Sequence, residues 1–367
     1  MKLCAALLLS ALLVSLSVTA QETLRTFDLS PKGTIHVTTE LIVKKFASAD
    51  FTYSPLQDAD TSSITALDVS KAKKLPVHVE KKKVHITLPY ASNDRAEFRM
   101  SVGEEIPATG LTVQRLLDKG RYVFLLPAGY TVRSCSLPAQ IKTTAGRVSL
   151  GVVQSSDVPQ PVQVMIAKAA PLTESPYKGS FLALDKQIIL YDLQDPAEHR
   201  IRLWLEMYVE KPGQSHFYSQ LRIPDQTSDP VTLDVDRGLE LPTRIVSGKE
   251  ANVIGDAPAP FPEDGRILVA DLGYSIPEGG SARLRSFQTA TDVDGYRLTD
   301  PDTLRLDRFI SRTRTLYLLP AGWNVTSIDQ PGILSTNPDG RVLVTFAGNT
   351  GKSNSLTIIA ERQKSNW

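Results

Sequence analysis

The chain contains a long internal repeat. Residues 35–76 align without a gap to residues 201–242 at a constant offset of 166, and twelve of these 42 positions are identical. Further on, residues 121–130 match residues 314–323 at an offset of 193. Matching blocks in a fixed order indicate duplication, and a period of this length is too long for a solenoid unit. The sequence therefore predicts two homologous domains in tandem.

Both copies show the alternation of apolar and polar residues that is typical of strands with one buried face. Ile35, Val37 and Leu41 alternate with polar neighbours, and turn residues separate the strand-like runs. Antiparallel sheets with one solvated face produce this pattern. We therefore predict an all-β fold of two tandem, homologous, antiparallel β-sandwich-like domains, over residues 21–170 and 187–363, with a linker at 171–186.

The second copy carries extra residues. The two offsets differ by 193 − 166 = 27 residues, and the additional length falls in the second copy. We expect an inserted loop region at about 243–303, which includes the rigid segment Ala-Pro-Ala-Pro-Phe-Pro at 257–262. Loops on a rigid scaffold often carry function, so Phe261 becomes a candidate binding residue.

The N-terminus has the pattern of a secretory signal peptide over residues 1–20. Lys2 supplies the charge, residues 3–18 the apolar segment, and Val18-Thr-Ala20 the small-residue cleavage site. The alternative is a membrane anchor, but serines interrupt the apolar segment, which is short for a span. No later segment is long or apolar enough to span. We predict a secreted or periplasmic protein whose one remaining cysteine, Cys135, is buried in a strand.

The two halves carry opposite net charge. Residues 21–170 hold 19 Lys and Arg against 14 Asp and Glu, which gives +5, and residues 171–367 hold 21 against 26, which gives −5. Opposite charges favour association, within one chain or between chains, and salt weakens it. The alternatives are salt-sensitive self-association and simple divergence after the duplication.

No catalytic motif is complete. Asp292-Val-Asp294-Gly resembles the middle of a calcium loop, but the first and last ligand positions are Ala290 and Pro301, so only an irregular calcium site is possible. The five histidines lack zinc-binding spacing, although His78 and His85 are predicted to face each other across a hairpin. We expect no cofactor and no nucleic-acid partner.

Two surface features are candidates for binding. Trp204 and Tyr208 lie on the face of strand 201–209 opposite the predicted core, where exposed aromatic area indicates a contact surface. They form a possible sugar-stacking platform, and the alternative is that this face is covered. Trp323 is a further aromatic candidate. Lys81, Lys82 and Lys83, at a predicted hairpin tip, either attract anionic polymers or protect an edge strand from pairing.

The second half resembles a group of secreted bacterial proteins of unknown activity, most clearly at Leu-Leu-Pro-Ala-Gly-Trp323 and Pro-Asp-Gly-Arg-Val342. The resemblance covers about half of the predicted mature chain. It implies export and a β fold, and it identifies no site.

These observations favour an exported, non-enzymatic binding or assembly protein of the envelope or extracellular space, with a protein or glycan partner. The alternative is a secreted hydrolase of envelope or extracellular polysaccharide, since glycosidases need two carboxylates beside the scissile bond. The inserted region offers candidate carboxylates at Glu263, Asp264, Asp292 and Asp294. Asn324 begins one glycosylation sequon.

Overall fold

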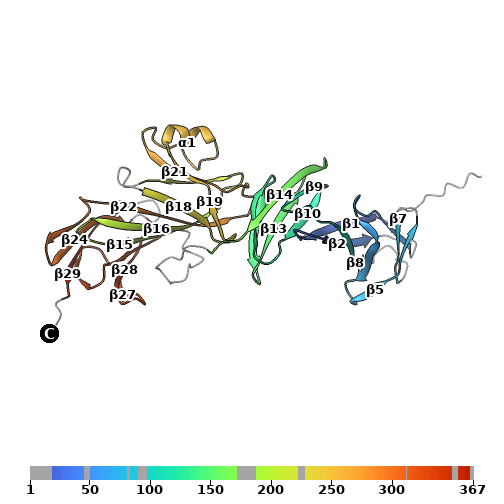
Figure 1. Ribbon diagram of the computed structural model, residues 1–367, viewed down its shortest axis with the longest axis horizontal. Helices are drawn as coiled ribbons and strands as arrows, with labels where there is room; N and C mark the ends of the chain where they lie inside the picture. The colour runs from blue at the N-terminus through green and yellow to red at the C-terminus, as the bar shows by residue number, and fades with distance from the viewer. Residues whose placement is uncertain are drawn as a thin grey trace, which may run out of the picture. The chain divides into compact units, whose positions relative to one another are not determined.

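The computed structural model describes residues 19–44, 50–80, 83–89, 97–171, 187–221, 228–310, 312–348 and 354–363. Within these ranges the regular structure is β-strand apart from one helix, α1 (Gly248–Ile254) (Figure 1). The prediction of an all-β fold with several antiparallel sheets is confirmed. Residues 1–18 of the predicted signal peptide, together with Lys81 and Lys82, lie outside the described residues.

The chain divides into two compact units. Unit 1 comprises Met1–Gly110, Leu117–Leu125 and Val153–Gln160, and unit 2 comprises Leu111–Leu116, Leu126–Val152 and Pro161–Trp367. These boundaries do not follow the domain boundaries derived from the repeat, which remain a prediction.

Unit 1 packs a large sheet against a small one. The large sheet has the strand order β10-β1-β2-β8-β4-β5, in which β1 and β10 are parallel, and the small sheet has the order β3-β7-β6. A core of aliphatic and aromatic residues, including Val43, Phe51 and Met100, lies between them. The strands are β1 (Thr19–Asp28), β2 (Thr34–Lys44), β3 (Asp50–Tyr53), β4 (Asp60–Asp68), β5 (Lys73–Leu75), β6 (Val77–Glu80), β7 (Lys83–Thr87), β8 (Glu97–Pro107) and β10 (Gly120–Leu125).

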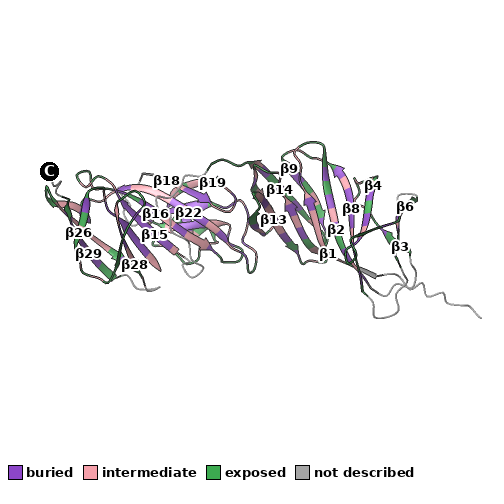
Figure 2. Ribbon diagram, turned by 90° about the horizontal axis from the view of Figure 1, so that it is seen from below, coloured by how far each residue is buried: buried purple, intermediate pink, exposed green. Residues whose placement is uncertain are grey.

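Unit 2 begins with strands from the first half of the chain. The sheet β11-β14-β9 and the hairpin β12–β13 belong to this unit. Buried and exposed residues alternate along β13 and β14, as Figure 2 shows. Cys135, at the end of β11, is buried as predicted. The strands are β9 (Thr112–Leu117), β11 (Tyr130–Cys135), β12 (Ala139–Thr144), β13 (Arg147–Gln154) and β14 (Gln160–Lys168).

The rest of unit 2 forms three further sheets. Their orders are β19-β18-β22-β16-β15-β25-β28-β27, β17-β21-β20 and β23-β24-β29-β26. The strands are β15 (Gln187–Leu193), β16 (Arg200–Val209), β17 (His216–Gln220), β18 (Ser228–Asp234), β19 (Leu239–Leu241), β20 (Thr243–Ser247), β21 (Arg266–Asp271), β22 (Ala282–Thr291), β23 (Tyr296–Asp300), β24 (Thr303–Ile310), β25 (Arg314–Leu318), β26 (Trp323–Ile328), β27 (Ile333–Thr336), β28 (Val342–Ala347) and β29 (Asn354–Arg362).

The strand orders repeat between the two halves of the chain. The order β10-β1-β2-β8-β4-β5 corresponds to β25-β15-β16-β22-β18-β19, and in both cases the first two strands are parallel. The small sheet β3-β7-β6 corresponds to β17-β21-β20, and β9-β14-β11 corresponds to β24-β29-β26. The sequence repeat therefore reflects two copies of one topology. Strand β23 has no counterpart among the described residues of the first copy.

A second addition lies between β20 and β21. Residues 248–265 fill this connection, whereas only residues 81 and 82 separate β6 from β7. The added segment starts with α1, whose N-terminus is capped by the Ser247 hydroxyl, which accepts a hydrogen bond from the Glu250 amide at 3.1 Å. The Asn252 side chain bonds both backbone groups of Phe261 at 2.8 and 2.9 Å. The insertion is thus a folded cap that packs on β20 and β21 (Figure 1).

Candidate functional site

The predicted aromatic platform on β16 is not exposed. Trp204 is 3% exposed and stacks on Phe287, with ring centroids 4.6 Å apart, in a cluster that includes Leu190 and Leu316. Trp204 therefore offers no exposed stacking face, and the alternative, in which this face of the strand is covered, holds at this position. Tyr208 is half-buried.

The other two aromatic candidates are also packed into the fold. Trp323 is 5% exposed, belongs to a large hydrophobic core and is covered by the Arg362 guanidinium, 5.2 Å from the ring centroid. Phe261 is half-buried and contacts Tyr218, with centroids 5.6 Å apart. Trp323 borders a hollow of about 430 Å³, but the face of its ring is occupied by Arg362.

Of the three candidate lysines at the predicted hairpin tip, Lys83 lies within the described residues and is exposed at the start of β7. It is paired with Glu80 of β6, the outer strand of its sheet. Lys73 and Lys74 are exposed on β5, which is also an outer strand. This placement suits protection of sheet edges against pairing with other chains. His78 and His85 are directly opposite each other on β6 and β7, as predicted.

The four candidate carboxylates lie in two segments, Glu263 and Asp264 before β21 and Asp292 and Asp294 between β22 and β23. Asp292 forms an ion pair with Arg308, and its other oxygen accepts the Gly295 amide at 3.0 Å. Asp294, Glu263 and Asp264 are exposed. Among the described residues there is no group of three or more Asp, Glu, His or Cys side chains arranged to hold a metal ion.

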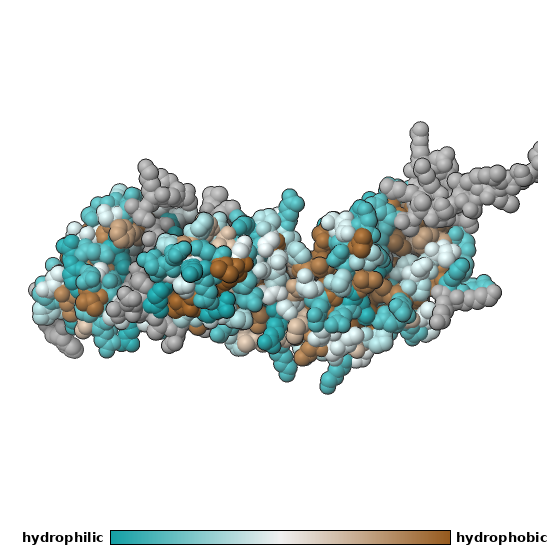
Figure 3. Space-filling view, turned by 90° about the horizontal axis from the view of Figure 1, so that it is seen from above, coloured by the Kyte–Doolittle hydropathy of each residue, from teal (hydrophilic) through white to brown (hydrophobic). Residues whose placement is uncertain are grey.

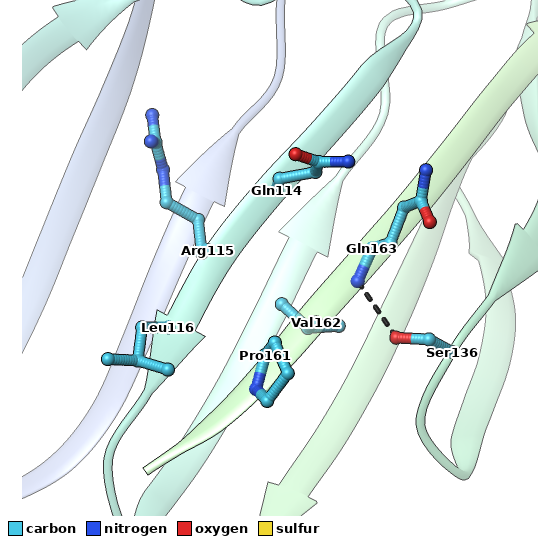
Figure 4. A pocket seen from close by; sticks show the side chains of 7 residues that line it. All are labelled: Gln114, Arg115, Leu116, Ser136, Pro161, Val162 and Gln163. Carbon is cyan, nitrogen blue, oxygen red and sulfur yellow. Dashed lines mark hydrogen bonds between the residues drawn. The ribbon is translucent and has the colours of Figure 1, made fainter.

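The β9–β14 groove is a shallow hollow of about 520 Å³ on the face of the sheet β11-β14-β9 (Figure 4). Large apolar side chains are exposed at several places on the molecule (Figure 3), so exposure alone does not mark a site. Here exposed apolar and amide side chains surround a hollow. Its lining residues are Gln114, Arg115, Leu116, Ser136, Pro161, Val162 and Gln163.

Strand alternation produces this groove. Gln114 and Leu116 are exposed on β9, Pro161 and Gln163 on β14, and Val162 between the latter two is buried. The backbone amide of Gln163 donates to the Ser136 hydroxyl at 2.9 Å, which links β14 to the residue that follows β11 (Figure 4). Leu116 is 67% exposed. These four exposed side chains carry no charge, and depletion of charge is a feature of interface centres.

A second hollow, of about 320 Å³, lies on the sheet β17-β21-β20. His216, Arg244 and Asp271 line it. The inserted segment supplies Asp256, whose Oδ2 accepts the Ser215 and His216 amides at 2.7 and 3.0 Å and lies 3.0 Å from His216 Nδ1. The Tyr218 hydroxyl donates to Oδ1. Asp256 therefore anchors the insertion to the start of β17.

This cluster contains a serine, a histidine and an aspartate, but not in the order of a catalytic triad. In a triad the serine and the aspartate contact different imidazole nitrogens. Here the Ser215 hydroxyl lies 3.1 Å from His216 Nδ1, the same nitrogen that contacts Asp256. The arrangement orients the histidine ring and holds the loop, and the Ser215 hydroxyl donates to Asp256 Oδ2 at 2.8 Å.

The Asp256 carboxylate predicts an acid-dependent contribution to stability. Burial raises its pKa, but hydrogen bonds from Tyr218, Ser215 and His216 outweigh burial and lower the pKa to about 2. Since the folded pKa lies below the ordinary value of 3.8, this contribution is present above pH 4 and is lost as the pH falls toward 2. Wild type should exceed Asp256→Asn in unfolding free energy by about 1–2 kcal/mol at pH 6. Urea unfolding at pH 6 and pH 2.5 should show this difference shrinking; a constant difference would contradict it.

The two hollows were not predicted from the sequence. Neither the pairing of β14 with β9 nor the groove between them was expected. In the segment 161–165, Pro161 and Met165 lie on one face of the strand and Val162 and Val164 on the other. Apolar residues on both faces could have indicated that each face makes contacts.

No family model matches the sequence, and no curated protein matches it. Among solved structures, the chain is similar to an M1 zinc metallopeptidase from Deinococcus radiodurans at 11% identity and a TM-score of 0.29, over 40% of this chain and 42% of that one. It is also similar to collagen adhesin from S. aureus at 8% identity and a TM-score of 0.17, over 79% and 83% of the two chains. The chain thus spans less than half the length of the peptidase. Within the described residues no helix is long and apolar enough to cross a membrane.

Proposed function

We propose that the chain is an exported, non-enzymatic binding protein that holds an extended segment of a partner protein in the β9–β14 groove. The observation that carries the proposal is the set of exposed, uncharged side chains around this groove, in which Leu116 and Pro161 lie beside the side-chain amides of Gln114 and Gln163; Arg115, half-buried, is the charged residue of the lining. Primary amides both donate and accept hydrogen bonds, as the backbone of an extended peptide does. Export rests on the signal pattern at residues 1–20.

The spacing of the lining residues suits an extended ligand. Gln114 and Leu116 are two positions apart on β9, and Pro161 and Gln163 are two positions apart on β14. Residues two apart on a strand lie on one face about 6.8 Å from each other, which is also the repeat of an extended peptide. An extended partner segment can therefore place successive side chains against successive groove residues.

Leu116→Glu tests the groove. The substitution places a charge at an apolar lining position that is 67% exposed, so we expect at least about tenfold weaker binding of the partner. The measurement is affinity capture from the envelope and secreted fraction, followed by titration of the captured protein. Ile333→Glu is the control, because Ile333 is 70% exposed on β27, away from the groove. Equal capture by both variants and wild type would reject the groove as the binding surface.

A further inference from the structure

Strands β9 and β24 occupy corresponding places in the two copies. The offset of 193 that relates residues 121–130 to 314–323 also relates Leu111 to Leu304, Arg115 to Arg308 and Leu116 to Phe309. Leu116 and Phe309 are both exposed, at 67% and 56%. In each sheet the strand pairs on one side with an equivalent strand, β14 or β29.

The other edge of β24 is covered by β23. The two strands are antiparallel, with Tyr296 opposite Leu306 and Leu298 opposite Leu304. The Asp307 amide donates to the Gly295 carbonyl at 2.8 Å at the end of the pair. Tyr296 is fully buried, and Leu298 packs against the core of this part of unit 2.

In the described stretch 97–171, no strand occupies the position of β23. Strand β8 ends at Pro107 and β9 begins at Thr112, and β9 is the outer strand of its sheet in the described structure. The consequence is visible in the side chains: Leu304 is fully buried, whereas Leu111 at the equivalent position is 51% exposed.

The outer edge of β9 also lacks the lysines that are found at other outer strands. The outer strand β5 carries Lys73 and Lys74, and the outer strand β6 is followed by a run of three lysines. Strand β9 contains no lysine and no proline, and its one charged residue is the half-buried Arg115. Exposed edges that remain monomeric usually carry such residues, because unpaired backbone groups template the addition of another strand.

We propose that β9 accepts an extended polypeptide segment of a partner protein as an added antiparallel strand, in the place that β23 occupies beside β24. The segment carries apolar side chains at alternate positions, as Tyr296 and Leu298 do in β23, and one of them covers Leu111. This inference deepens the proposed function and rests on it, because it states how the partner beside the β9–β14 groove is held. Main-chain hydrogen bonds supply affinity in this mode, and alternate side chains supply specificity.

The alternation of the backbone identifies which groups receive the added strand. The Leu111 carbonyl accepts the Ile166 amide at 2.9 Å, so the backbone groups of Leu111 and Val113 point toward β14. The backbone groups of Gln114 point away from β14, toward the outer edge of the sheet. The backbone groups of the equivalent Asp307 point toward β23 in the same way, and the Asp307 amide donates to the Gly295 carbonyl. The Gln114 amide is therefore a donor for the incoming strand.

The test uses the full chain and a fluorescently labelled peptide that copies residues 294–301, the segment that contains β23. Anisotropy titration should show saturable binding. Gln114→Pro removes one outward donor and should weaken binding at least about tenfold, since proline is tolerated at sheet edges but cannot donate. Gln114→Ala removes the same side-chain amide but keeps the backbone donor, so Gln114→Pro should bind at least about fivefold more weakly than Gln114→Ala.

Modified peptides give the same test without altering the protein. The Gly295–Asp307 bond places the Arg297 amide toward the receiving strand and the Leu298 amide away from it. N-methylation at Arg297 should abolish binding to the wild-type chain, and N-methylation at Leu298 should not. No binding of the unmodified peptide, or equal loss with both methylated peptides, would overturn the proposal.

Two further outcomes are distinguishable. If the chain is a dimer that Gln114→Pro converts to a monomer in sedimentation, a second copy occupies the edge and the partner proposal is wrong. If a captured partner is lost with Leu116→Glu but binds Gln114→Pro as tightly as wild type, the groove function stands and strand addition fails.

Discussion

Trp204→Ala is expected to lower the free energy of unfolding by about 3–5 kcal/mol, the usual cost of truncating a large buried aromatic residue. Trp204 is 3% exposed, stacks on Phe287 and packs among Ile188, Leu190 and Leu316, so the truncation removes many packing contacts and leaves a cavity. Urea unfolding followed by far-UV circular dichroism measures this loss.

Trp204→Phe is the control for this prediction. The indole Nε1 is buried without a hydrogen-bond partner in the described structure, so phenylalanine removes an unsatisfied donor and keeps most of the packing. We expect a loss of less than about 1.5 kcal/mol. An unchanged stability in Trp204→Ala, together with a lost ligand, would instead restore the exposed aromatic platform. If Trp204→Ala is destabilised as expected, a loss of binding in this variant reports the damaged fold and not a lost contact with the ligand.

The β-strands could be predicted because alternation is local information. The burial of Trp204 depends on what lies against the second face of the sheet, which alternation in one strand does not reveal. A signal was nevertheless present in neighbouring strands: the runs at 188–191 and 316–319 are continuously apolar. Continuous runs indicate strands that are covered on both faces. Reading β16 together with these runs would have placed Trp204 in a core.

The candidate sites depended on contacts that the sequence does not encode locally. The groove combines residues 114–116 with residue 136 and residues 161–163. Asp256 reaches Ser215 and His216 across about forty residues, from an insertion whose path is set by α1 and the Asn252–Phe261 bonds. The duplication could be found in the sequence, but the absence of a β23 equivalent beside β9 became visible only when the two strand orders were compared.

Arg237→Ala is expected to destabilise unit 2 by about 3–5 kcal/mol, because it leaves the Asp234 carboxylate buried without its counter-charge. Arg237 is 1% exposed, and its Nε donates to Asp234 Oδ2 at 2.7 Å. Its Nη1 donates to the carbonyls of Val132 and Arg133 at 3.1 and 3.3 Å, and the guanidinium lies over the Tyr274 ring. The substitution therefore removes contacts between β11 and the second copy as well as the ion pair.

The duplication provides the matched control. Lys71 stands at the position equivalent to Arg237 at the offset of 166, and its backbone amide donates to Asp68 just as the Arg237 amide donates to Asp234. The Lys71 side chain is exposed, so Lys71→Ala should change stability by less than about 0.5 kcal/mol. Urea unfolding of both variants compares two equivalent turns, of which only the turn in the second copy holds a buried guanidinium. Equal losses would assign the effect to the turn itself, whereas a loss confined to Arg237→Ala would assign it to the ion pair and the β11 carbonyls.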